Sequence, residues 1–286
     1  MEIREFAEKV QKAVALVLGE EYKVKLQEVR KNNGVFLQGL IILKEKQNVS
    51  PTIYLQPFWE AYEEGVTLLE VVTRILQIDK EDVPRDNIDM TFFRDFDKVK
   101  DRICYRLIHA ERNEELLKEI PYVPFLDLAI CFYYAYEGEA LGSGSILIHN
   151  SHMGMWKTNI AELMCLAQHN TPRLFPWECG SMESIVGEIK EELPLYIVTN
   201  KQKIHGAACI LYPNLLTGIG EGMNANFYIL PSSVHEVILL TDSGNESQVQ
   251  LRKMIAEVNR TQVEPEEVLS DSLYYFDRMA KQVKIV

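Results

Sequence analysis

The sequence contains none of the short motifs that mark a nucleotide-binding loop, a serine hydrolase elbow or a structural metal site. Its five cysteines, at positions 104, 131, 165, 179 and 209, include no C-x-x-C pair. An odd number of cysteines without such a pair argues against a disulfide framework and against a zinc ribbon. No Walker lysine motif, G-x-S-x-G elbow or S-x-x-K pair is present. We expect buried structural thiols in a reducing compartment, and we expect no cofactor and no metal.

Basic residues are also scarce, and long apolar runs are missing. The chain has 30 Lys and Arg against 42 Asp and Glu, which gives a formal net charge of −12. A field of that sign repels phosphate backbones and anionic lipids. Apolar runs such as 237–240 are far shorter than the roughly 20 residues of a membrane span, and the charged start Met1-Glu2 is unlike a secretory signal. We expect a cytoplasmic protein with no nucleic-acid partner and no membrane partner.

The composition is that of an ordinary globular protein. Hydrophobic residues make up 47% and charged residues 25% of the 286 positions. A chain of this size can bury a full core. We expect a single domain over 1–286, in which a change of pattern near residue 150 leaves room for two lobes, about 1–150 and 151–286.

The first residues show clear periodicity. Apolar side chains at helical spacing predict a helix over 3–18, which Gly19 ends. Alternating apolar and polar residues predict strands over 23–27 and 35–43. Between these strands Asn32-Asn33-Gly34 predicts a hairpin turn, because Asn and Gly tolerate positive φ.

Later segments alternate between the two patterns. Thr67 and Glu70 have the spacing of a capping box and predict a helix start, whereas 102–109 is compatible with either a strand or a helix. Thr171-Pro172 is expected to end a helix over 159–170. Strand pairs joined by tight turns predict an α+β fold with mixed or mainly antiparallel sheets and helices packed on one face. Further helices are predicted at 113–119, 181–191, 215–223, 247–260 and 271–281, and strands at 125–134, 144–148, 195–199, 207–212, 227–230 and 236–240.

The candidate functional segment lies between two apolar strands. It gathers hydroxyls, an imidazole and a carboxylate within a few positions: Pro231, Ser232, Ser233, His235 and Glu236. A serine nucleophile needs a base within hydrogen-bond reach and a third group that orients the base. However, His235 and Glu236 are adjacent in a strand and point to opposite faces. The alternative is a structural role, in which the segment is a polar turn whose hydroxyls form hydrogen bonds to free backbone groups, and this alternative is favoured.

Two weaker patterns are compatible with purely structural roles. His149 and His152 form an H-x-x-H pair, with His169, His205 and His235 as further candidates, but zinc needs three or four converging ligands. Gly218, Gly220 and Gly222 lack the strand–glycine–helix context of a dinucleotide fingerprint. Solvated or singly bonded histidines and a flexible or tightly turning backbone are the favoured interpretations.

The chain also resembles an uncharacterised family of bacterial proteins found mainly in anaerobic Gram-positive bacteria. The resemblance extends over nearly the whole chain, and its most specific part is a P-S-S-x-H-E motif at 231–236. It implies a family without an assigned activity and therefore no mechanism. The other residues that carry it are Arg106-Leu107-Ile108, Asn113, Leu116-Leu117, Asp127-Leu128-Ala129, Asn170-Thr171-Pro172 and Gly206-Ala207-Ala208.

These observations favour a non-enzymatic binding or regulatory protein that acts through a protein or small-molecule partner. The alternative is a hydrolase-like enzyme built on the segment that contains Ser232, Ser233, His235 and Glu236. The two hypotheses differ in the surroundings expected for His235. An enzyme requires this imidazole to face a hydroxyl at about 3 Å and to be oriented by an acid.

Overall fold

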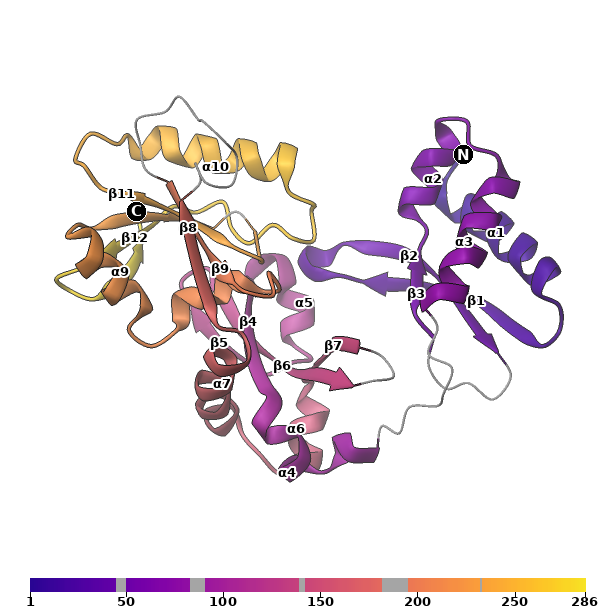
Figure 1. Cartoon of the computed structure of the whole chain (residues 1–286), viewed down its shortest axis with the longest axis horizontal. Helices are drawn as coiled ribbons and strands as arrows, with labels where there is room; N and C mark the ends of the chain where they lie inside the picture. The colour runs from indigo at the N-terminus through magenta and orange to yellow at the C-terminus, as the bar shows by residue number, and fades with distance from the viewer. Residues whose placement is uncertain (45–49, 83–90, 139–141, 182–194, 232) are drawn as a thin grey trace. The chain divides into compact units, whose positions relative to one another are not determined.

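The structure is a computed structural model that describes residues 1–44, 50–82, 91–138, 142–181, 195–231 and 233–286. The chain forms two compact units, which are drawn in Figure 1. Unit 1 contains residues 1–90 and 137–143, and unit 2 contains residues 91–136 and 144–286. The change of pattern near residue 150 falls inside unit 2, between a strand and a helix. The predicted helix at 181–191 lies almost entirely outside the described residues.

Unit 1 is a three-stranded antiparallel sheet with helices, in the order β1-β2-β3. Asn33 and Gly34 both have positive φ, at 59° and 68°, and form the predicted hairpin turn between the first two strands. Phe6, Val10 and Val14 of the first helix are fully buried against the sheet. The elements are α1 (Ile3–Leu18), β1 (Tyr22–Arg30), the 3₁₀ turn η1 (Asn32–Gly34), β2 (Phe36–Lys44), β3 (Thr52–Tyr54), α2 (Gln56–Glu63) and α3 (Leu68–Asp82).

The predicted capping box starts α3. The Thr67 backbone N–H and hydroxyl both donate to Glu70 Oε2, at 2.9 and 2.8 Å, and the Glu70 N–H donates back to Thr67 Oγ1. These bonds lower the pKa of the Glu70 carboxyl, chiefly through the backbone N–H of Thr67. The reciprocal bonds satisfy donors that a helix start would otherwise leave open.

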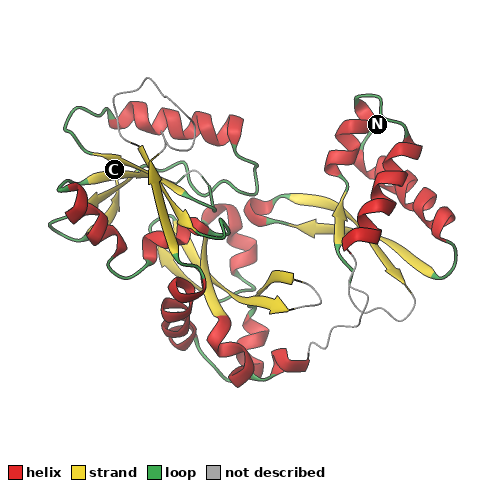
Figure 2. Ribbon diagram, viewed as in Figure 1, coloured by secondary structure: helices red, strands yellow, loops and turns green. Residues whose placement is uncertain are grey.

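Unit 2 contains a six-stranded antiparallel sheet and a second sheet in which β4-β6-β5 pair antiparallel and β7 also joins β6. Figure 2 shows helices and strands interleaved along this unit, and together with unit 1 they confirm the α+β fold class. The six-stranded sheet has the order β13-β12-β10-β11-β9-β8. Its strands are β8 (Trp177–Ser181), β9 (Leu195–Asn200), β10 (Phe227–Leu230), β11 (Val237–Thr241), β12 (Tyr274–Asp277) and β13 (Gln282–Ile285).

The second sheet of unit 2 comes entirely before residue 150 in the chain. Its strands are β4 (Ile103–His109), β5 (Tyr122–Phe125), β6 (Leu128–Gly138) and β7 (Gly142–Leu147). The ambiguous segment 102–109 is therefore a strand. The helices of the unit are α4 (Phe96–Val99), α5 (Glu114–Leu117), α6 (Asn150–Trp156), α7 (Ile160–Leu174), α9 (Leu215–Met223) and α10 (Gln248–Gln262), and the 3₁₀ helices are η2 (Thr91–Arg94), η3 (Lys100–Arg102), η4 (Glu111–Asn113) and η5 (Gly206–Leu211).

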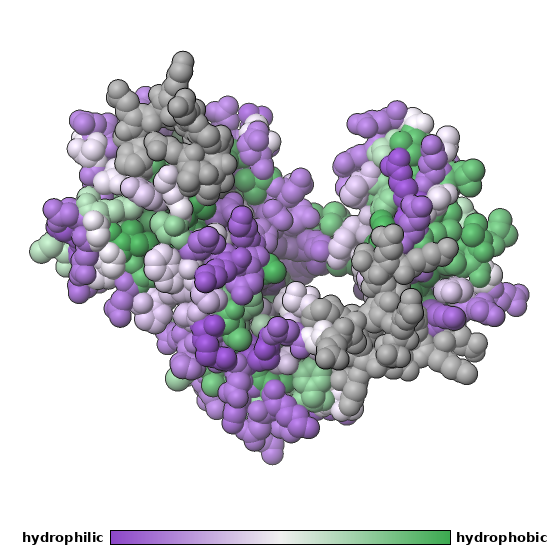
Figure 3. Space-filling view, viewed as in Figure 1, coloured by the Kyte–Doolittle hydropathy of each residue, from purple (hydrophilic) through white to green (hydrophobic). Residues whose placement is uncertain are grey.

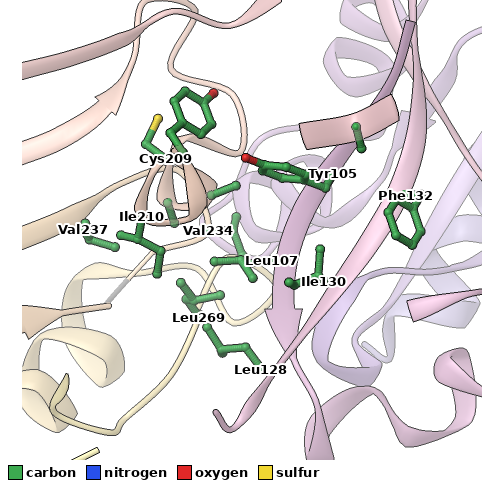
Figure 4. Close-up of a cluster of buried hydrophobic side chains, with 14 of the residues drawn as sticks. Tyr105, Leu107, Leu128, Ile130, Phe132, Cys209, Ile210, Val234, Val237 and Leu269 are labelled. Carbon is green, nitrogen blue, oxygen red and sulfur yellow. The ribbon is translucent and has the colours of Figure 1, made fainter. Parts of the chain in front are cut away.

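The main core of unit 2 joins the two sheets. Tyr105 and Leu107 of β4 point toward Ile210 and Val234, as Figure 4 shows, and these residues belong to one buried cluster. On the other side of the six-stranded sheet, Ile255 of α10 packs in a smaller cluster with residues of β10 and β11. Because strand side chains alternate, burying Tyr105 and Leu107 here leaves Cys104, Arg106 and Ile108 on the opposite face of β4.

Two predicted elements have the wrong type. Residues 207–212 do not form a strand, because 206–211 wind into the 3₁₀ helix η5, and 271–281 do not form a helix, because β12 pairs with β10 and β13 there. Short apolar runs are compatible with either type of element, and the sheet contacts decide between them.

The predicted end of helix α7 is also wrong, because the helix runs through Pro172 to Leu174. Two polar residues hold its last turns against β4. Asn170 Nδ2 donates to the Ile103 carbonyl at 3.0 Å, and Thr171 Oγ1 accepts the Tyr105 N–H at 3.1 Å. These bonds offset the single backbone donor that proline lacks.

The five thiols differ in exposure. Cys104, Cys131 and Cys209 are buried as expected, whereas Cys179 is half-buried and Cys165 is exposed on α7. The expectation of a buried thiol is therefore wrong for Cys165.

No helix in the described ranges has the length and apolar character that crossing a membrane requires. The visible surface in Figure 3 is mainly hydrophilic.

Candidate functional site

The segment singled out in the sequence connects β10 to β11. Pro231 is buried, Ser232 lies outside the described residues, and Glu236 is half-buried just before β11. Ser233 forms an isolated β-bridge with Val268, and its Oγ accepts the backbone N–H of His235 at 3.0 Å. The Ser233 hydroxyl thus accepts a hydrogen bond from the backbone of its own turn, as expected for a polar turn without a catalytic role.

Both ring nitrogens of His235 have protein partners. Its Nδ1 accepts the backbone N–H of His205 at 3.3 Å, and its Nε2 lies 3.3 Å from Oε1 of Glu267. The acid that faces the imidazole is therefore Glu267, which is distant in sequence, and not the neighbouring Glu236. With Nδ1 accepting the His205 N–H, the nitrogen that faces the Glu267 carboxylate is Nε2.

His205 lies directly beside His235. The two imidazole rings are stacked, with centroids 5.9 Å apart and planes 9° apart, and the ring of Tyr133 lies 5.5 Å from His205. The His205 backbone has a left-handed φ of 53° at the start of η5. Its Nδ1 is inaccessible to solvent and has no hydrogen-bond partner among the described residues. Burial, then the nearby charge of Arg106 and the His235 ring, lower the pKa of His205 to about 3.

A close backbone approach holds His205 in this position. A Cβ atom on Gly206 would lie 2.2 Å from Thr199 Oγ1 and 2.3 Å from the His235 carbonyl oxygen. The same two groups bond each other, because the Thr199 hydroxyl donates to that carbonyl at 2.7 Å. Only glycine fits between them.

The pairing of β4 with β6 determines which side chains share a face of the sheet with Arg106. It lies opposite Cys131 in the β4–β6 ladder, and Cys104 lies opposite Tyr133. All four side chains are therefore on one face, with Tyr133 diagonal to Arg106. The arginine interacts electrostatically with Cys131, Tyr133 and His205.

The guanidinium of Arg106 has no counter-charge in the described part of the chain. The side chain is half-buried, its Nε is inaccessible to solvent and unbonded, and no described carboxylate forms an ion pair with it. Burial lowers its pKa, although an arginine stays protonated at neutral pH. Tyr133 is buried, and burial raises the pKa of its hydroxyl, which makes no hydrogen bond to a described residue. We call Arg106, Tyr133, His205, His235 and Glu267 the Arg106 cluster.

Other sequence candidates do not converge on a site. His152 accepts the His149 backbone N–H at 3.1 Å and packs against Phe93 and Trp156, while His169 is exposed on α7. Within the described ranges, no three His, Cys, Asp or Glu side chains are placed to hold a metal ion. The glycines at 218, 220 and 222 belong to helix α9, where Gly220 packs against an aromatic ring.

The neutrality of His205 predicts a pH dependence of stability. In the unfolded chain this imidazole binds a proton below about pH 6.5, whereas in the folded chain its pKa is about 3. Between these values the unfolded state binds more protons, so the free energy of unfolding decreases as the pH falls through this window. We expect the slope of that free energy against pH to be steeper in the wild type than in His205→Gln, by up to about 1.4 kcal/mol per pH unit.

Chemical denaturation at several pH values between 4 and 7 measures both slopes. The comparison cancels the carboxylates, which titrate in both proteins. Equal slopes would mean that His205 is protonated in the folded state, contrary to this interpretation.

Sequence reasoning did not single out Arg106, Tyr133 or Glu267 as site residues. A signal for Arg106 is present, because it is the only Lys, Arg, Asp or Glu in the strand 103–109, where most positions are buried. Tyr133 looks like an ordinary core aromatic. Glu267 is one of several glutamates in 264–267, and only the fold brings it to His235.

Comparison with known proteins places the chain in one family. A family model whose description is "Family of unknown function" (DUF5688) matches residues 3–278. No curated protein and no solved structure matches the chain.

Proposed function

The chain belongs to DUF5688, a family of unknown function, and we propose that this member is a non-enzymatic binding protein of the bacterial cytoplasm whose ligand carries an anionic group that pairs with Arg106. The observation that carries the proposal is the half-buried guanidinium without a counter-charge among the described residues. A regulatory role through this ligand is part of the proposal.

The physical argument concerns the free energy of an unpaired charge. Removing a cation from water costs several kcal/mol unless an opposite charge compensates it. Water can supply hydrogen bonds to the guanidinium but not a charge. Arg106 and His205 both keep part of their surface accessible, so a ligand from solution can reach the cluster. An anion that binds there recovers the lost solvation and gains charge-assisted hydrogen bonds.

The hydrolase-like alternative has one observation in its favour, which is the His235–Glu267 pair at 3.3 Å. A nucleophilic serine, however, needs its hydroxyl to face the ring nitrogen of the base. Ser233 Oγ instead accepts the backbone N–H of His235, and the Nδ1 of His235 accepts the His205 N–H. These bonds favour binding over bond cleavage.

The test compares anion binding by the wild type and Arg106→Met. Sodium benzoate, acetate and phosphate are titrated by calorimetry against sodium chloride at equal ionic strength. We expect at least one probe to bind the wild type and its Kd to rise at least about tenfold in Arg106→Met, because charge-assisted hydrogen bonds contribute roughly 1.5–3 kcal/mol.

Lys253→Met is the matched control, because it removes one positive charge from an exposed position of α10. It should leave the Kd unchanged. Equal losses in both variants would reduce the effect to net charge and contradict a site at Arg106. Hydrolysis of a p-nitrophenyl ester that disappears in Ser233→Ala would also contradict the proposal, in favour of the hydrolase.

A further inference from the structure

A cavity separate from the Arg106 cluster lies in unit 2, between strand β8, the end of helix α7 and residues 212–219. Its volume is about 570 Å³, within the range of roughly 300–1,000 Å³ that is typical of small-molecule sites. None of the described residues that line the cavity belongs to the Arg106 cluster. The cavity is therefore a second candidate site for a small molecule.

The lining of this cavity is apolar and uncharged over its described part. It contains no Asp, Glu, Lys, Arg or His side chain and consists mainly of aromatic, aliphatic and proline residues. The buried hydroxyl of Tyr212 already donates to the Phe175 carbonyl at 2.7 Å. A charged ligand would lose hydration in such a cavity without meeting an opposite charge. The lining therefore favours an uncharged molecule.

Strand β8 supplies an exposed aromatic ring to the cavity. Trp177 and Cys179 both line the cavity, whereas the intervening Glu178 does not, so the cavity lies against one face of the strand. Trp177 is 48% exposed. Covering an exposed indole ring with a second flat ring removes apolar surface from water and adds favourable ring contacts. Trp177 therefore favours an aromatic ligand.

Asn214 provides a polar contact at the edge of the cavity. It is the N-cap residue of α9, but its side chain makes no capping hydrogen bond to the helix. The side chain is exposed and lines the cavity. An amide both donates and accepts hydrogen bonds, so Asn214 can bond an N–H, O–H or C=O group of a ligand.

We propose that this cavity binds an uncharged, planar aromatic molecule, which covers the ring of Trp177 and forms a hydrogen bond with Asn214. Trp177 supplies the aromatic contact, Asn214 the directional bond, and the uncharged lining excludes ions. The site is independent of the anion site at Arg106, so either can exist without the other.

Calorimetric titration of the full chain at pH 7 tests the ligand class. Indole is the uncharged aromatic probe, indoleacetate and tryptamine are its anionic and cationic analogues, and cyclohexanol is an uncharged molecule without an aromatic ring. We expect indole to bind with a Kd at least about tenfold lower than that of each other probe. Arg106→Met should leave the Kd for indole unchanged, whatever its effect on anions.

Two variants show where indole binds. In Gly218→Leu the new side chain should fill the cavity, because apart from the backbone of its own helix no described atom lies within 4 Å of the Cβ position at this lining residue. Leucine is also a better helix former than glycine, so α9 should be retained. We expect the Kd for indole to rise at least about tenfold in Gly218→Leu and in Trp177→Ala. Gly222→Leu is the matched control, because Gly222 lies in the same helix, has an equally open Cβ position and does not line the cavity.

The thiol of Cys179 reports directly on occupancy of the cavity. Its alkylation by N-ethylmaleimide is followed by mass spectrometry of peptides, with the exposed Cys165, which does not line the cavity, as internal reference. At an indole concentration about five times its Kd, alkylation of Cys179 should slow about sixfold relative to Cys165, because about one molecule in six remains free.

Four results would overturn the proposal. If indole does not bind, the site does not exist. If a charged analogue binds as tightly as indole, the ligand is not an uncharged molecule, and if cyclohexanol does so, the aromatic ring is not recognised. If indole binds equally well to Gly218→Leu, or leaves Cys179 unprotected, its site lies elsewhere in the chain.

Discussion

Replacing Gly206 with alanine is expected to lower the free energy of unfolding of unit 2 by about 3 kcal/mol or more, because overpacking against atoms that cannot move is costly. The new methyl group would lie 2.2 Å from Thr199 Oγ1, 2.3 Å from the His235 carbonyl oxygen and 2.8 Å from the Asn200 nitrogen. Two of these atoms belong to the backbone, so a side-chain rotation cannot relieve the overlap. The segments that hold His205 and His235 together would have to separate.

Gly218→Ala is the matched control for this prediction. Gly218 lies within helix α9, and apart from the backbone of its own helix no atom of the described residues lies within 4 Å of the position its Cβ would take. Alanine there should stabilise the protein by up to about 1 kcal/mol, because glycine is the poorer helix former. Thermal unfolding followed by fluorescence measures both variants, and the buried Trp156 reports on unit 2. A Gly206→Ala protein as stable as the wild type would show that the approach at residue 206 is looser than described.

Local patterns in the sequence predicted the elements whose contacts are also local. The hairpin at Asn33-Gly34 and the capping box at Thr67 depend on residues within three positions of one another, and both are present. Segments 207–212 and 271–281 differ from their predicted types because non-local sheet pairing and packing decide their structure. Helix α7 continues past its predicted end for the same reason, since β4 provides the partners of Asn170 and Thr171.

The candidate site was only partly visible in the sequence. The motif at 231–236 drew attention to His235, and the structure gives that residue a contact with Glu267, which no local pattern predicts. His205 is a candidate metal ligand or a neighbour of the serine segment by sequence alone, and the burial of its Nδ1 depends on tertiary packing. The significance of Arg106 lies in the absence of a counter-charge among the described residues around it, and this absence can be recognised only when those neighbours are known.

Arg106→Met is expected to raise the free energy of unfolding of the protein without ligand by about 1–2 kcal/mol, because the charged head is partly removed from water and no carboxylate among the described residues pairs with it. Methionine keeps an unbranched apolar side chain similar to the aliphatic part of arginine, so packing against the neighbouring strand β6 is retained. The effect has the opposite sign to that of most substitutions in a strand, which destabilise. It follows from the same feature that we propose for binding, since an uncompensated charge reduces stability until an anion neutralises it.

Arg106→Lys separates the charge from the side-chain shape. Lysine keeps the positive charge and its desolvation, so it should not show the gain in stability that methionine gives. Urea unfolding of the three proteins, without carboxylate or phosphate in the buffer, provides the comparison. If Arg106→Met were less stable than the wild type by 1 kcal/mol or more, the arginine would be a structural residue with partners in the folded chain. Its charge would then be compensated and would not be available to a ligand. A gain in stability together with a loss of benzoate binding would instead show that this position favours recognition at the expense of stability, as functional sites commonly do.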